Sequence, residues 1–163
     1  CIDNVIAALA ASGTRLATAE MQRRAQSLMA ELGVAEYAER RAGTLAYGLQ
    51  RRLEIARALA LEPRYLLLDE PAAGMNETES DDLLGILAGL RDSRGLGLLV
   101  VDHDLRLIMR LCDRVVVLNK GQVIAEGAPE EVQANPDVIE AYLGKRRAAT
   151  KTAPHSTQGR EEP

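Results

Sequence analysis

The sequence predicts an α/β protein in which helices flank a mostly parallel sheet and a separate helical region precedes that sheet. Between residues 65 and 124, short apolar runs alternate with helical patterns, as right-handed strand–helix–strand connections require. Residues 1–61 carry helical patterns and no clear strand-like run. Hydrophobic residues make up 47% of the chain but aromatic ones only 2%, so the core must be aliphatic, which favours helices packed on a parallel sheet.

Two amphipathic stretches define the helical region. One helical face carries the apolar residues Met21, Ala25, Leu28, Met29 and Leu32,. Gly33 follows as a candidate left-handed C-cap. The second helix is predicted from about residue 48 to 61, with Leu53, Ala56 and Ala60 on one side, and Pro63 bars its continuation,.

The alternating region predicts strands at 65–68, 98–101 and 115–118 and helices at 77–91 and 105–111. The run 65–68 is apolar throughout, so we expect it to be covered on both faces. Asn76 and Glu79 form a capping-box pattern at the start of the first of these helices. Residues 119–122 turn the chain into the apolar run 123–125, which predicts an antiparallel hairpin. Pro129 and Pro136 each mark the first turn of a short helix.

The chain of 163 residues divides into three predicted parts: a helical subdomain (1–61), a sheet-containing core with a C-terminal extension (62–144) and a disordered polar tail (145–163),. The net charge of −4 gives no reason to expect a nucleic-acid partner,. No apolar run approaches the roughly 18 residues of a membrane span. Cys1 and Cys112 show no disulfide or metal-ligand spacing, and no signal peptide is visible, so we expect a cytoplasmic protein. Because the sequence starts at Cys1 and not at a Met, we expect it to be a piece of a longer chain.

Two acids follow the first apolar strand. Asp69 and Glu70 come directly after the run 66–68, and ligands of parallel sheets bind at the carboxyl ends of the strands. A carboxylate there can hold Mg²⁺, and a second one can polarise an attacking water. A solvated turn is the alternative interpretation of this pair.

Two further signals lie on either side of these acids. Gly48 stands at a predicted helix start, where a phosphate can approach free backbone N–H groups, although a tight loop entering a helix gives the same pattern. His103 follows the second apolar strand, where it is either a structural residue or a donor to a terminal phosphate oxygen,.

Taken together in this order, the three signals resemble the ABC ATPases, a family of P-loop NTPases. Residues matching the family's signature are Leu45, Ala46, Tyr47, Gly48 and Leu49. The resemblance implies that Asp69 is the Mg²⁺-linked Walker B aspartate and Glu70 the general base. It also implies that residues 73–76, ending in Asn76, form the D-loop, and that His103 is the H-loop histidine.

The Tyr-Gly pair and the run 72–76 are similar to one branch, the ATP-binding subunits of branched-chain amino acid importers, as are residues 127–144. Ala46 replaces the signature serine, Tyr47 its first glycine and Leu49 its glutamine, and Asn76 replaces the D-loop aspartate. Without the serine hydroxyl, the contact to the γ-phosphate must come from the backbone.

No G-x-x-x-x-G-K-[ST] phosphate-binding loop occurs in the sequence, and the family's Q-loop is also absent,. The resemblance therefore implies the C-terminal portion of an ATPase that binds ATP and Mg²⁺ and is inactive as this piece alone. Its implied partners are a second ATP-binding subunit arranged head to tail, transmembrane permease subunits and, indirectly, a substrate-binding protein, at the cytoplasmic face of the membrane. Two alternatives stay open: a non-catalytic module that lends its signature and docking surface to a partner, and a soluble ABC ATPase.

Overall fold

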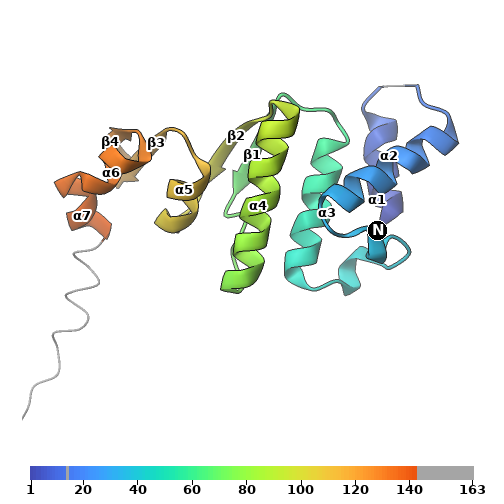
Figure 1. Cartoon of the computed structure of the whole chain (residues 1–163), viewed down its shortest axis with the longest axis horizontal. Helices are drawn as coiled ribbons and strands as arrows, with labels where there is room; N and C mark the ends of the chain where they lie inside the picture. The colour runs from blue at the N-terminus through green and yellow to red at the C-terminus, as the bar shows by residue number, and fades with distance from the viewer. Residues whose placement is uncertain (14, 143–163) are drawn as a thin grey trace, which may run out of the picture. The chain divides into compact units, whose positions relative to one another are not determined.

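The structure is a computed structural model that describes residues 1–13 and 15–142 (Figure 1). The chain forms two compact units, one spanning Cys1–Leu111 and the other beginning at Cys112. The predicted boundary near residue 61 does not coincide with a division between these units, and that subdomain boundary stays a prediction. The tail predicted for residues 145–163 lies outside the described residues.

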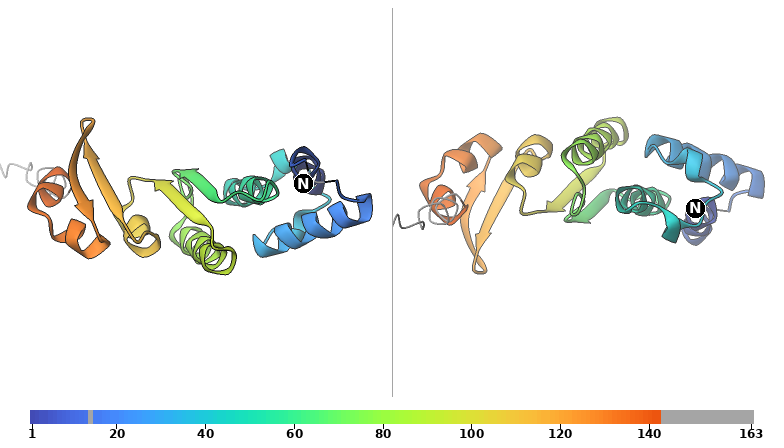
Figure 2. Two further views of the ribbon diagram at one scale, coloured as in Figure 1. Left: turned by 90° about the horizontal axis from the view of Figure 1, so that it is seen from above. Right: turned by 90° about the horizontal axis from the view of Figure 1, so that it is seen from below.

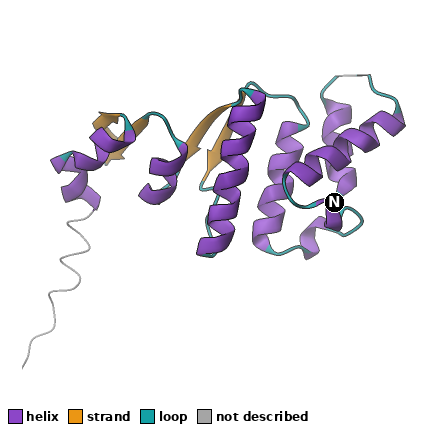
Figure 3. Cartoon of the chain, in the orientation of Figure 1, coloured by secondary structure: helices purple, strands orange, loops and turns teal. Residues whose placement is uncertain are grey.

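The first unit begins with helices α1 (Ile2–Ala11), α2 (Thr18–Glu31) and α3 (Tyr47–Leu59), with two 3₁₀ turns at Ala35–Tyr37 and Ala42–Thr44 (Figure 3). Their apolar stripes meet in a core that includes Val5, Leu9, Ala25, Met29, Leu53 and Ala56. Gly33 follows the C-cap residue of α2, Leu32, and has a φ of +67°, as its position predicts. Both helices expected from the periodicity of this region are confirmed.

The same unit continues with β1 (Tyr65–Asp69), α4 (Glu77–Arg94), β2 (Gly97–Val101) and α5 (Leu105–Leu111). β1 and β2 pair in parallel, from Tyr65 opposite Gly97 to Asp69 opposite Val101. The predicted capping box is present, because Asn76 Oδ1 accepts from Glu79 N–H at 2.9 Å and Glu79 Oε2 accepts from Asn76 N–H at 3.0 Å. The α4 leucines that face the core are buried: Leu83, Leu84, Leu87 and Leu90.

The two faces of the parallel pair differ. Leu66 and Leu68 are 6% and 8% exposed, whereas Leu67 and Leu99 are 70% and 59% exposed. Successive strand side chains point to opposite faces, and only one face packs against the rest of the unit. The expectation that β1 is covered on both faces is therefore wrong for the described residues.

The second unit contains the hairpin of β3 (Val115–Asn119) and β4 (Gln122–Gly127), followed by α6 (Pro129–Ala134) and α7 (Pro136–Tyr142) (Figure 2). Lys120 and Gly121 both have positive φ, 49° and 80°, as a tight two-residue hairpin turn requires,. The hairpin and both proline-initiated helices are confirmed.

The predicted α/β class is confirmed, since the described chain combines helices with β-strands in each unit. The described strands form one parallel pair and one antiparallel pair. A two-residue turn brings β3 and β4 together at a very small loop-closure cost. In the described part of the chain, no helix combines the length and the apolar character needed to cross a membrane.

Two neighbouring residues of β1, Leu66 and Leu67, test whether only one face of the β1–β2 pair is packed. Leu66→Ala should lower the free energy of unfolding by about 2–4 kcal/mol, because it leaves a cavity in the core. Leu67→Ala should cost less than about 1 kcal/mol, because its side chain is already in solvent. Urea unfolding of the two variants of this chain measures both. If both variants lost the same free energy of unfolding, the conclusion that the Leu67 face of β1 is open to solvent would be contradicted.

Candidate functional site

The parallel pairing of β1 and β2 brings two of the predicted site residues together. Glu70 N–H donates to Val101 O at 2.8 Å, so the two strands end side by side. Beyond these ends, His103 Nδ1 lies 3.2 Å from Glu70 Oε1. Both side chains are open to solvent, at 76% exposed for His103 and 51% for Glu70. The pair can therefore reach a ligand placed over the strand ends.

Asp102 is a third member of this cluster that no site prediction included. Its side chain is only 4% exposed, and its Oδ1 lies 3.6 Å from His103 Nδ1. The same oxygen accepts from Asp104 N–H at 2.9 Å, which fixes the turn that carries the histidine. The sequence signal that could have identified Asp102 is an acid directly before a histidine at a strand end.

Asp104 holds the start of α5. Its Oδ1 accepts from Arg106 N–H at 2.9 Å. Burial alone raises the pKa of the Asp104 carboxyl, but hydrogen bonds from Arg106 and from backbone N–H groups lower the net pKa below its ordinary value. Asp104 is therefore an ionised cap at neutral pH, next to the loop that presents His103.

Glu70 has an unusual backbone conformation. Its φ is +44°, in the left-handed region, where a side chain crowds the following carbonyl at a cost of roughly 1–2 kcal/mol. Its carbonyl accepts from Ala73 N–H at 3.1 Å. The strand end thus turns sharply at the carboxylate.

The predicted signature segment (residues 45–49) leads into α3. Ala46 is the N-cap residue and supplies no side-chain hydrogen bond. The helical ladder begins when Gln50 N–H donates to Ala46 O at 3.0 Å, so the backbone N–H groups of residues 47–49 have no intrahelical partner. Those donors and the helix dipole together can hold an anion.

The signature segment packs against the predicted D-loop segment (residues 73–76). A Cβ atom built on Gly48 would lie 3.8 Å from Met75 side-chain atoms, and one on Gly74 would lie 3.6 Å from the Tyr47 ring. Gly74 has a φ of +73°. Asn76 serves as the N-cap of α4, so its direct role toward a nucleotide stays a prediction.

Arg51 connects these parts, although the sequence analysis gave it no role. Its Nη2 donates to Asp69 O at 3.3 Å, and its Nη1 donates to Glu54 at 2.8 Å. Its guanidinium carbon lies 5.9 Å from the centre of the Tyr47 ring, within cation–π range. The hydrogen bond to Glu54 raises the pKa of Arg51. The sequence signal that could have identified Arg51 is its place one helical turn after Tyr47.

Asp69, the predicted Mg²⁺ ligand, is exposed at the end of β1. Within residues 1–13 and 15–142, no three His, Cys, Asp or Glu side chains gather closely enough to form a metal site. Mg²⁺ commonly takes one or two carboxylates and completes its shell with phosphate oxygens and water. The exposed carboxylate of Asp69 is suited to be one ligand in a site of that kind.

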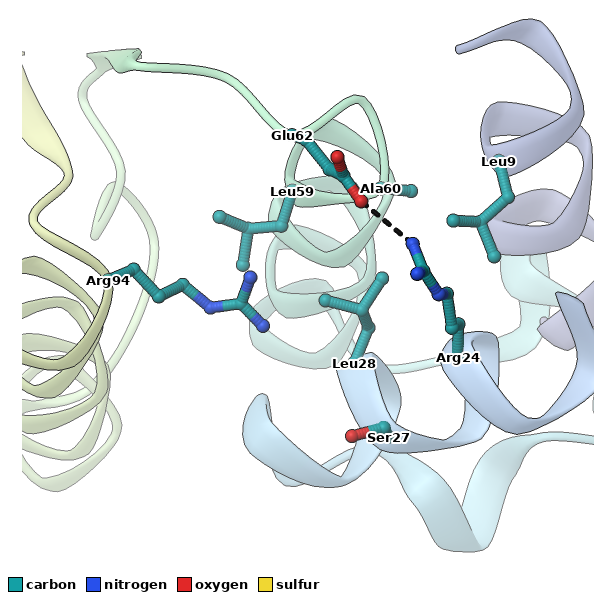
Figure 4. Close-up of a pocket in the computed structure, with 8 residues that line it drawn as sticks. All are labelled: Leu9, Arg24, Ser27, Leu28, Leu59, Ala60, Glu62 and Arg94. Atoms are coloured by element: carbon teal, nitrogen blue, oxygen red, sulfur yellow. Dashed lines mark hydrogen bonds and ion pairs between the residues drawn. The ribbon is translucent and has the colours of Figure 1, made fainter. Parts of the chain in front are cut away.

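A cavity of about 270 Å³ lies away from the Glu70–His103 pair, among α1, α2, α3 and the C-terminal end of α4 (Figure 4). Two arginines line it, and each is paired with a glutamate: Arg24 with Glu62 at 2.8 Å and Arg94 with Glu31 at 2.6 Å. Leu9, Leu28 and Leu59 provide apolar walls. Because its cations are already neutralised, this cavity offers no ready site for an anion.

Two substitutions at Glu70 test the backbone strain. Because glycine adopts a positive φ without a steric cost, Glu70→Gly should be more stable than Glu70→Ala by about 1 kcal/mol. At the matched control Asp92, in the last turn of α4, the order should reverse by up to about 1 kcal/mol,. Melting temperatures of the four variants give the comparison. A Glu70→Ala variant as stable as Glu70→Gly would show that no strain is present.

Two substitutions distinguish the capping role of Asn76 at the start of α4 from any further role of its side chain. Asn76→Ala should cost about 1 kcal/mol of stability, because the Glu79 N–H loses its acceptor, whereas Asn76→Asp should keep the cap. Thermal unfolding of both variants measures the difference. If Asn76→Asp lost as much stability as Asn76→Ala, the cap would not explain the effect.

Comparison with known proteins identifies the family of this chain. A model of the ABC transporter family matches residues 3–73, and a model described as branched-chain amino acid ATP-binding cassette transporter matches residues 122–148. The BraF ATP-binding protein of high-affinity branched-chain amino acid transport from Pseudomonas aeruginosa is 52% identical over 115 residues, covering 71% of this chain and 45% of BraF. LivG from Salmonella typhimurium, of the same description, is 47% identical over 131 residues, covering 80% of this chain and 51% of LivG.

A solved structure supports the same assignment. The ADP conformation of MJ1267, an ATP-binding cassette of an ABC transporter, superposes with a TM-score of 0.75 at 26% identity, covering 88% of this chain and 62% of MJ1267. The chain spans about half the length of the curated relatives that it matches. The family models and these relatives together show that the chain belongs to the ATP-binding domains of ABC transporters.

Proposed function

We propose that the complete protein is the ATP-hydrolysing subunit of an ABC importer for branched-chain amino acids. The observation that carries this proposal is the Glu70–His103 pair, held 3.2 Å apart at the adjacent ends of two parallel strands. The relatives BraF and LivG, which are named for branched-chain amino acid transport, support the substrate class.

In this proposal, Glu70 accepts a proton from the water that attacks the γ-phosphate. His103 keeps Nδ1 toward Glu70, which leaves its Nε2 to face the terminal phosphate,. Asp69 would hold Mg²⁺, which neutralises charge on the phosphates when it is bound. The exposure of Glu70 and His103 is consistent with a nucleotide that enters from solvent.

The signature segment would serve the nucleotide of the opposite subunit. The N-terminal backbone donors of α3 can hold its γ-phosphate without the missing serine hydroxyl. The adjacent D-loop segment, including Asn76, would line the same dimer interface. Two head-to-tail subunits would therefore share two nucleotides, and hydrolysis at Glu70 would allow the dimer to reopen.

The phosphate-binding loop and the Q-loop are expected in the part of the relatives that this chain does not match. The open apolar face of β1 and β2, with Leu67 and Leu99 exposed, agrees with a sheet that gains cover in a longer protein. The helical region would dock on permease subunits at the cytoplasmic face of the membrane, with a substrate-binding protein as an indirect partner.

One observation favours a non-catalytic module as the second candidate. Ala46 gives α3 no side-chain cap, and Leu49 replaces the family's glutamine, so the signature offers fewer side-chain donors than usual. In that case the chain would lend only its signature and docking surface to a catalytic partner.

A conservative substitution of Glu70 tests the proposal in the protein expressed from its complete open reading frame. Glu70→Gln should lower ATP hydrolysis at least about 100-fold, because the amide cannot accept the proton, and ATP-bound dimers should accumulate. Phosphate release and size-exclusion chromatography measure the two effects.

The matched control is Glu140→Gln, at an exposed acid of α7, which should hydrolyse ATP at the wild-type rate. Unchanged hydrolysis by Glu70→Gln would remove Glu70 as the base. A complete wild-type protein that hydrolyses no ATP would instead favour the non-catalytic module.

A further inference from the structure

The peptide bond between Asp69 and Glu70 is held from both sides. Its N–H group, on Glu70, donates to Val101 O of β2 at 2.8 Å. In a trans peptide the carbonyl points the opposite way, so Asp69 O faces away from β2. There it accepts from Arg51 Nη2 at 3.3 Å. The orientation of this peptide therefore depends on β2 and on helix α3 together.

This peptide sets where the Glu70 carboxylate lies. Glu70 has a φ of +44°, and φ is the rotation that immediately follows the peptide plane. A left-handed conformation persists at a non-glycine residue only where its surroundings hold it. Without the bond from Arg51, only the hydrogen bond to Val101 O would hold the plane, and the carboxylate could move away from His103, which lies 3.2 Å from it.

Arg51 is itself fixed by the signature segment. It lies four residues after Tyr47 and therefore on the same face of α3, with its guanidinium over the Tyr47 ring. Glu54 holds the Nη1 side at 2.8 Å. The Nε atom is buried and has no hydrogen-bond partner among the described residues. A guanidinium is a rigid planar fork, so movement of Tyr47 or of the first turn of α3 is passed to the Asp69 carbonyl.

Arg51 also lies in a groove between α3 and β1. A cavity of about 130 Å³ is lined there by Arg51, Glu54, Ile55, Ala58, residues 66–69 and Pro71. Across this gap, the hydrogen bond from Arg51 to Asp69 O is a direct polar link between the helix and the end of the strand. A shift of α3 would therefore move Arg51 and, through this hydrogen bond, the carbonyl of Asp69.

We propose that Arg51 is a positioning residue that holds the Glu70 base in its reactive orientation and links it to the signature segment of the same subunit. This inference rests on the proposed function, because it assigns a task only if Glu70 acts as the base. Arg51 acts through the Asp69–Glu70 peptide and does not touch the nucleotide. Its loss should slow the chemical step and leave nucleotide capture intact.

The test uses the protein expressed from its complete open reading frame. Arg51→Met keeps the long apolar stem but removes the guanidinium, and it should lower kcat about 10-fold or more while the KM for ATP stays within about twofold. Arg51→Lys keeps the charge but not the fork, and it should give an intermediate kcat. The control Arg57→Met, at an exposed arginine on the same helix, should match the wild type.

A second measurement separates positioning of the base from a loosened signature. In the Glu70→Gln background, adding Arg51→Met should leave ATP-dependent dimer formation unchanged, because the residue on which Arg51 acts is already disabled. Loss of dimer formation in that double variant would overturn the proposal, since Arg51 would then be needed for nucleotide capture.

The remaining outcomes are also distinct. If the wild type hydrolyses ATP and Arg51→Met does so at the same kcat, the positioning role is wrong although the proposed function stands. If the wild type hydrolyses none, the proposed function fails first. If Arg51→Met does not fold, Arg51→Lys decides: a lowered kcat with an unchanged KM supports the role, and a wild-type kcat overturns it.

Discussion

The parallel register of β1 and β2 is the constraint on which the candidate site depends. Because Asp69 lies opposite Val101, the chain leaves both strands at the same edge, and Glu70 and His103 emerge next to one another. A shift of one residue in this register would turn every side chain of the shifted strand to the other face. The burial of Leu66 and Leu68 resists such a shift, since both would move into solvent. Packing on one face of the sheet thereby determines the chemistry available at its end.

The site is assembled mainly from backbone groups and turns. Gly74 and Glu70 both have positive φ, and each lies where the chain reverses after β1. Asn76 then fixes the start of α4 through a reciprocal pair of hydrogen bonds. These local features leave few conformations open to residues 69–76. Glu70, with its strained backbone conformation, therefore lies between a capped helix and a paired strand, and this surrounding structure holds it in place,.

Local signals in the sequence predicted local structure well, and tertiary contacts account for what was missed. Asn76 and Glu79 predicted their own capping box, and residues 119–122 predicted the hairpin turn, because both depend on neighbours a few residues away. The apolar run 65–68 indicated that both faces of β1 need cover, but it could not show whether the described residues provide it. The link from Arg51 to Asp69 spans 18 residues, and no local pattern specifies it. Asp102 was visible as an acid beside His103, but only its burial marks it as part of the site.

The departures from the family's signature leave the backbone donors at the start of α3 in place. A serine at position 46 would offer one hydroxyl donor, whereas the first turn of α3 offers several backbone N–H groups and the positive end of the helix dipole. Ala46 keeps the extended conformation of an N-cap residue, with φ −59° and ψ 152°, so those donors still point out of the helix. Tyr47, in place of a glycine, adds a ring that a Cβ atom at Gly74 would meet at 3.6 Å and that lies 5.9 Å from the Arg51 guanidinium carbon. In this chain the Tyr47 side chain therefore lies between Gly74 and the arginine that binds the strand end before Glu70.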